Sequence, residues 1–127
     1  MKINLKGGNI MSMMNLRIYD RARKEMFNIT EVKYDSNGTY VKHASSTDWI
    51  SVTDSNYYVM VGSGFKDMNG VEIFEGDIVE VIAMCPGGKD FKGVVKFYEC
   101  GFFIDNGEES IQLFDEVSQR KIVGHVN

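Results

Sequence analysis

Residues 65–79 read FKDMNGVEIFEGDIV, and this stretch decides the class of fold. It holds two turn sequences, Asn69-Gly70 and Gly76-Asp77, with the apolar pair Ile73-Phe74 between them. Asparagine tolerates the left-handed backbone region and glycine has no Cβ to clash there, so such pairs close tight turns. The segment therefore predicts short strands joined by turns rather than a helix.

The same pattern recurs elsewhere in the chain. Asn37-Gly38 and Asn106-Gly107 each stand between runs of β-forming residues. After the opening stretch, short apolar runs separated by turn residues predict five strands over 78–83, 93–98, 102–105, 110–113 and 121–126. Helical periodicity is weak and confined to 21–27 and 114–119. We expect a mainly β fold (α+β at most), in which the Gly-Asp-x-Val-x-Val run from Gly76 opens a small SH3-like barrel.

The length and composition of the chain suit one compact protein. Its 127 residues, 43% of them hydrophobic with one proline, can bury a core without disulfide or metal staples. We expect an N-terminal extension over 1–15, a β-rich lobe over 16–64 and an SH3-like barrel lobe over 65–127. Lys6-Gly7-Gly8 resembles a translated ribosome-binding sequence, and three methionines follow it by residue 14. This predicts that native translation starts at one of them.

Charge is unevenly distributed along the chain. Residues 1–64 carry eight Lys/Arg against six Asp/Glu, and residues 65–127 carry six against twelve, which gives the net charge of −4. Because an acidic half repels phosphates, nucleic acid is not expected as the main partner. A local basic and aromatic cluster in the first half is the candidate partner-binding site, and its members are Arg17, Tyr19, Arg21, Arg23 and Lys24.

The sequence predicts a cytoplasmic protein that does not enter membranes. No run approaches the roughly 20 apolar residues needed to cross a bilayer, and the first 16 residues lack the unbroken apolar run of a signal peptide. Cys85 and Cys100 lie outside any Cys-x-x-Cys spacing, so we expect two free thiols and no zinc site. A disulfide between them stays open, because both lie near predicted strand ends.

No set of residues predicts an enzyme, a cofactor or a metal site. The histidines are His43, expected in a solvated loop beside two serines, and His125, expected in a structural or exposed position. Gly87-Gly88-Lys89 lacks the spacing of a phosphate-binding loop. The acids around Asn106-Gly107 provide too few correctly spaced ligands for calcium, and the pair Glu108-Glu109 is expected to be solvated.

Residues 65–79 resemble the signature of the YopX-like proteins, which are small proteins of phages and prophages. Residues 16–27, 93–97 and 121–126 resemble the family's opening, middle and closing strands. The resemblance covers residues 16–126 in order; it departs at 61–63 and in ending at residue 127. It implies a β-rich first part and an SH3-like barrel. It supplies no catalytic residues, because the family has no established activity.

The signature has a sufficient structural explanation in turn and core chemistry. Its residues are Gly64, Phe65, Asp67, Asn69, Gly70, Ile73, Glu75, Gly76 and Asp77. The alternative is a partner-binding surface near Lys66, Asp67, Glu72 and Glu75. We expect a non-catalytic phage- or prophage-type accessory protein in a bacterial host cell, which binds another protein or its own copies through strand edges. The alternative function is a nucleic-acid-binding factor that uses the basic and aromatic first lobe.

Overall fold

The structure is a computed structural model that describes residues 15–83, 87–88, 90–114 and 118–126. The described chain is built from strands and turns, so the prediction of a mainly β protein is confirmed. It contains no helix that could cross a bilayer. The chain divides into a first unit up to Val61 and a second unit from Gly62 to Val126, and each is described by itself. The expected internal start sites and Cys85 lie outside the described residues.

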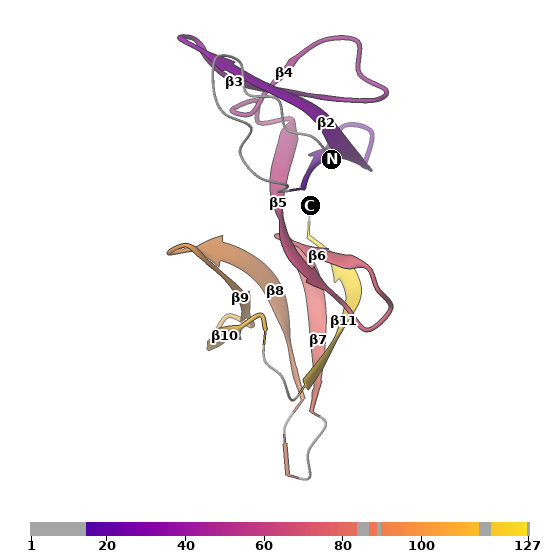
Figure 1. Cartoon of the computed structure of the whole chain (residues 1–127), viewed down its shortest axis with the longest axis vertical. Helices are drawn as coiled ribbons and strands as arrows, with labels where there is room; N and C mark the ends of the chain where they lie inside the picture. The colour runs from indigo at the N-terminus through magenta and orange to yellow at the C-terminus, as the bar shows by residue number, and fades with distance from the viewer. Residues whose placement is uncertain (1–14, 84–86, 89, 115–117, 127) are drawn as a thin grey trace. The chain divides into compact units, whose positions relative to one another are not determined.

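The first unit is an antiparallel sheet with the order β4-β3-β2-β1-β5 (Figure 1). Its strands are β1 (Leu16–Asp20), β2 (Glu25–Asp35), β3 (Gly38–His43), β4 (Ile50–Ser51) and the first half of β5 (Tyr57–Lys66). One face carries the core residues Ile18, Ile29, Val32 and Val41. Since side chains alternate across a strand, the neighbours of Val32 and Val41 point to the opposite face.

The weak helical periodicity over 21–27 does not correspond to a helix. β1 and β2 form a hairpin in which Ile18 lies opposite Phe27, and β2 already begins at Glu25. The connecting turn is stabilised by the Asp20 carboxylate, which accepts hydrogen bonds from the backbone N–H groups of Ala22 and Arg23 at 3.0 and 3.1 Å. A side chain that bonds the backbone two or three residues ahead favours a turn over a helix interior.

The second unit contains every one of the five predicted strands. They are β7 (Asp77–Ala83), β8 (Phe91–Tyr98), β9 (Gly101–Asp105), β10 (Ser110–Gln112) and β11 (Ser118–His125), preceded by the short β6 (Glu72–Phe74), which pairs with the second half of β5. The core consists of Ile73, Val79, Val81, Val95, Ile104 and Leu113. The weak helical periodicity over 114–119 corresponds to no helix in its described part, because Ser118 and Gln119 begin β11.

The sheet of the second unit is open. Its order is β10-β9-β8-β7-β11, so β10 and β11 are its two edges and the described strands form no closed barrel. β10 has three residues and pairs with β9, whereas β11 pairs with β7 along most of its length. The expected SH3-like barrel is therefore replaced by a five-stranded antiparallel sheet.

All three Asn-Gly pairs lie in turns, as predicted. Gly38, Gly70 and Gly107 have φ angles of 139°, 80° and 94°, in the region that favours glycine. The first pair joins β2 to β3, the second joins β5 to β6, and the third joins β9 to β10. The turn chemistry that predicts these hairpins is thus the chemistry that closes them.

The β8–β9 hairpin closes with two non-glycine residues in the left-handed region. Glu99 and Cys100 have φ angles of 50° and 61°, between Tyr98 and its cross-strand partner Gly101. Positive φ at both central positions is the requirement of the hairpin turn that Asn-Gly fits best. We expect the double substitution Glu99→Asn, Cys100→Gly to stabilise the protein by about 1–2 kcal/mol, because each L residue is strained there. Urea unfolding measures the gain, and an unchanged midpoint would contradict it.

Candidate functional site

Asp67 organises the signature segment and connects it to the last strand. Its carboxylate is 8% exposed and accepts three backbone hydrogen bonds: from Asn69 at 2.9 Å, from Val71 at 3.0 Å and from Ile122 at 3.2 Å. Burial raises the pKa of Asp67, but the N–H donors of Val71, Ile122 and Asn69 lower it, and the net pKa lies below its ordinary value. Both oxygens of this carboxylate accept backbone hydrogen bonds, so Asp67 acts as a structural acceptor.

The signature segment also covers the outer edge of β11. Met68 donates its backbone N–H to the carbonyl of Arg120 at 2.8 Å, and the N–H of Ile122 reaches Asp67. Both are backbone groups on the side of β11 that faces away from β7. An uncovered edge strand is a template for pairing with another chain. The loop after β5 therefore protects this edge from pairing.

The remaining signature residues divide between core, turns and surface. Ile73 is fully buried and Asp77, 2% exposed, accepts a hydrogen bond from the backbone N–H of Phe74 at 2.8 Å. Gly76 donates to the carbonyl of Val95 and accepts from the N–H of Val126, both at 2.8 Å. Three others lie at the surface or half-buried: Gly64 and Asn69 are exposed, and Glu75 is half-buried.

An apolar groove of about 330 Å³ lies beside the signature segment. Phe65 and Phe114 line it, and their rings stack with centroids 5.0 Å apart. Phe65 is 40% exposed and Phe114 is 52% exposed. Met68, 49% exposed, lines the same groove. The buried Arg120 also lines it, but its guanidinium donates to the carbonyls of Leu113 and Ser118. The groove thus offers aromatic and thioether surface, and Arg120 donates from Nε and Nη1 to the backbone beside it.

A second exposed surface covers the outer face of β2, β3 and β4 in the first unit. We call it the lysine–tryptophan face, and it consists of Lys33, Tyr40, Lys42 and Trp49. The Lys33 ammonium lies 4.6 Å from the Trp49 ring centroid and 5.4 Å from that of Tyr40. The Lys42 ammonium lies 5.0 Å from the Trp49 centroid. All four side chains are half-buried against one another.

Comparison with known proteins assigns the family. The family model described as YopX protein matches residues 15–126. The chain belongs to the YopX family. No curated protein matches the sequence.

Two solved structures share the fold. YopX from Bacillus subtilis is 20% identical, with 87% of this chain and 91% of that chain covered and a TM-score of 0.61. EF1440 from Enterococcus faecalis is also 20% identical, with 89% and 92% covered and a TM-score of 0.54. At this identity the likeness concerns the fold, so the site must be argued from the residues of this YopX family member.

The five residues of the predicted basic cluster do not share one surface. Tyr19 is 5% exposed, and Arg17 is half-buried with one guanidinium nitrogen 3.6 Å from the Met60 sulfur. The other three are exposed in the β1–β2 turn: Arg21 lies over the Tyr58 ring, Arg23 pairs with Asp20 at 3.8 Å, and Lys24 has a φ of 57°. A partner-binding role for the cluster stays a prediction.

His43 lies in a polar pocket of about 210 Å³ on the first unit. The expectation that it is solvated is wrong, because it is 6% exposed and stacks on Phe27 with ring centroids 4.1 Å apart. Its Nδ1 accepts the backbone N–H of Ser45, and the Ser46 hydroxyl bonds the backbone of His43. Burial, followed by the charge of Arg23, lowers the pKa of His43. The ring is therefore a packed part of this turn.

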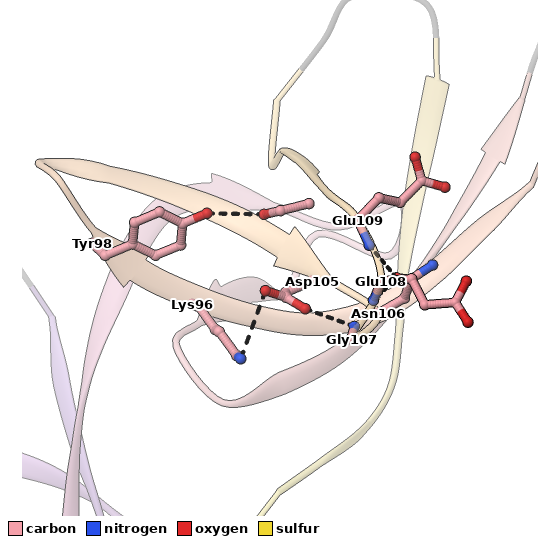
Figure 2. A network of polar contacts seen from close by, with 8 residues as sticks. Lys96, Tyr98, Asp105, Asn106, Gly107, Glu108 and Glu109 are labelled. Atoms are coloured by element: carbon pink, nitrogen blue, oxygen red, sulfur yellow. Dashed lines mark hydrogen bonds and ion pairs between the residues drawn. The ribbon is translucent and has the colours of Figure 1, made fainter.

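The side chains of Asp105 and Asn106 bond the backbone of their own turn (Figure 2). Asp105 accepts the N–H of Gly107 at 2.7 Å and lies 3.7 Å from Lys96. The Asn106 side chain accepts the N–H groups of Glu108 and Glu109, both at 2.8 Å. Within the described ranges, no group of three His, Cys, Asp or Glu residues could hold a metal ion. His125 and Cys100 are both exposed.

Proposed function

We propose that this YopX family member is a non-catalytic accessory protein of phage or prophage type that binds another polypeptide. Its binding surface is the apolar groove of the second unit. The observation that carries the proposal is the stacked pair Phe65–Phe114, two large aromatic rings that are each at least 40% exposed. Aromatic residues dominate binding hot spots because they bury much area and lose little entropy on binding.

The surroundings of the two rings fit an apolar side chain of a partner. Met68 adds an adaptable thioether to the groove. The rim is polar, since Lys66, Ser118 and Gln119 lie around it. An apolar centre within a polar rim is the usual arrangement of a protein interface. Exposed apolar surface of this kind on a folded unit typically marks an interaction site.

The non-catalytic part of the proposal is supported by the state of the polar groups near the groove. Asp67 accepts three backbone N–H groups, and Arg120 donates to two carbonyls. A general acid or base needs a side chain within reach of substrate and able to exchange a proton. Here both charged groups are committed to holding the backbone around the groove.

The test compares Phe65→Ser and Phe114→Ser with the control Val123→Ser, which removes an apolar side chain that is 43% exposed on β11. We expect each groove variant to weaken binding about 10-fold or more, because hot-spot truncations cost about 2 kcal/mol. Self-association is measured by sedimentation equilibrium. Binding to host or phage proteins is measured by quantitative affinity capture, and each captured partner is then purified and its binding measured directly.

The outcomes separate clearly. If both groove variants lose binding to a second copy or to a partner, and Val123→Ser keeps it, the result supports the groove as the binding surface. Binding that is unchanged in both groove variants contradicts it. Thermal melts check folding, and we expect them to stay close to the parent protein, since substitutions at exposed positions typically change stability by about 0.5 kcal/mol.

A further inference from the structure

The lysine–tryptophan face is a built surface rather than a chance gathering of side chains. β3 and β4 pair at Tyr40–Ser51 and Val41–Ile50, which places Trp49 beside Lys42. Lys33 lies directly across from Tyr40 on β2. Val32 and Val41 point into the core, so their neighbours Lys33, Tyr40 and Lys42 share the opposite face. The sheet therefore fixes the aromatic rings and the two ammonium groups together.

We propose that this face binds single-stranded nucleic acid, with one base stacked on Trp49 and neighbouring phosphates beside Lys33 and Lys42. The site belongs to the first unit and does not depend on the groove of the second unit. Single-strand binding surfaces combine an aromatic platform for a base with cations that follow the backbone. Both parts are present here in one patch, formed by β2, β3 and the residue that precedes β4.

The charges on the face favour an anion. Within the described part of the chain, neither lysine makes an ion pair with a carboxylate, and both ammonium groups lie close to the same ring. A phosphate beside the two ammonium groups would be attracted by both positive charges. The closest acid along the strand register is Glu31, which lies across from Lys42 on β2.

The aromatic ring selects among anionic polymers. An acidic peptide would satisfy the lysines but would make no use of the indole surface, whereas every nucleobase has a π-face that stacks on it. In a duplex the bases are already stacked on one another, so a single strand fits better. Because two lysines contact phosphates, a plot of the logarithm of the binding constant against the logarithm of the salt concentration is expected to have a slope of about −1.4.

The first experiment uses the only tryptophan of the chain as its reporter. The full-length protein is titrated at low salt with a 12-residue oligothymidine, with an abasic oligonucleotide of the same length, and with polyglutamate. We expect oligothymidine to quench Trp49 fluorescence, and the abasic strand to bind about 10- to 100-fold more weakly, because it lacks the stacked base. Equal binding of the abasic strand or of polyglutamate overturns the proposal, and so does no binding.

Variants test the named residues by fluorescence anisotropy of labelled oligothymidine. Trp49→Leu is expected to lose about 10- to 100-fold in affinity. Lys33→Gln and Lys42→Gln are each expected to reduce the salt slope by about 0.7. Glu31→Gln is expected to tighten binding, since it removes the acid beside Lys42. The control is Lys92→Gln, an exposed lysine of β8 in the second unit. A loss in Lys92→Gln equal to that in Lys33→Gln overturns the assignment.

Discussion

Gly93→Ala is expected to destabilise the protein by about 2–4 kcal/mol, because there is no room for a methyl group at this position. Gly93 is buried in the middle of β8, opposite Val79 of β7. A Cβ there would lie 2.5 Å from the backbone oxygen of Asp105 and 2.7 Å from its carbonyl carbon. Backbone atoms in a paired strand cannot rotate away as the end of a side chain can, so the β8–β9 pairing must shift.

Gly124→Ala is the matched control for this substitution. Gly124 also lies in a strand of the same sheet, but the added Cβ would meet only the end of the Ile78 side chain, at 3.6 Å. We expect its stability to stay within about 1 kcal/mol of the parent protein. Urea unfolding of the three proteins measures both effects. Equal midpoints for the two variants would show that β8 tolerates the methyl group.

Asp67→Ala is expected to cost about 3–5 kcal/mol of the free energy of unfolding. The substitution removes the acceptor of three backbone N–H groups, two in the signature loop and one in β11. A buried donor left without a partner costs about 1–3 kcal/mol. Asp35→Ala is the control, because Asp35 accepts one backbone hydrogen bond, from Asn37, in an exposed turn. We expect it to cost about 1 kcal/mol.

The pKa of Asp67 gives this prediction a pH dependence. Hydrogen bonds hold the pKa below 3.8 in the folded protein, so the unfolded chain takes up the proton first as pH falls. The contribution of the carboxylate is therefore complete well above that value and is lost as pH falls through the folded pKa. Asp67→Asn keeps the shape, removes the charge and replaces one of the two accepting oxygens by an NH2 group. The stability difference between the parent and Asp67→Asn should shrink from pH 7 to pH 3, and a constant difference would argue against a charge effect.

Much of the fold follows from local sequence chemistry. The Asn-Gly pairs end strands because the chain must enter the left-handed region there, and Gly38, Gly70 and Gly107 do so. The weak helical periodicity over 21–27 gives no helix for a local reason as well. Asp20 bonds the backbone of its own turn, and long strand pairing then takes over from Glu25. Whether the second sheet closes into a barrel could not be predicted from local sequence, because closure depends on how far β10 and β11 extend.

The candidate surfaces were less predictable. Tyr19 and Arg17 form part of a basic stretch in sequence. Strand alternation places both on the face of β1 opposite the core residue Ile18, and Tyr19 is buried there. The same alternation contains the signal for the lysine–tryptophan face, because Lys33 and Lys42 each follow a core valine directly. Trp49 joins them only through the β3–β4 pairing. The stacking of Phe65 on Phe114 joins residues far apart in the chain and has no local signature.

The position of β11 at the end of the second unit has a consequence for synthesis. β7 pairs with β8 on one side and with β11 on the other, and β11 follows β7 by more than 30 residues. While the chain is being made, β7 to β10 can form consecutive hairpins with short loops, which close quickly. Until residues 118–125 emerge from the ribosome, the other edge of β7 lacks its partner. In the nascent chain this unpaired edge, which is rich in valine and isoleucine, is where pairing with other chains can start aggregation.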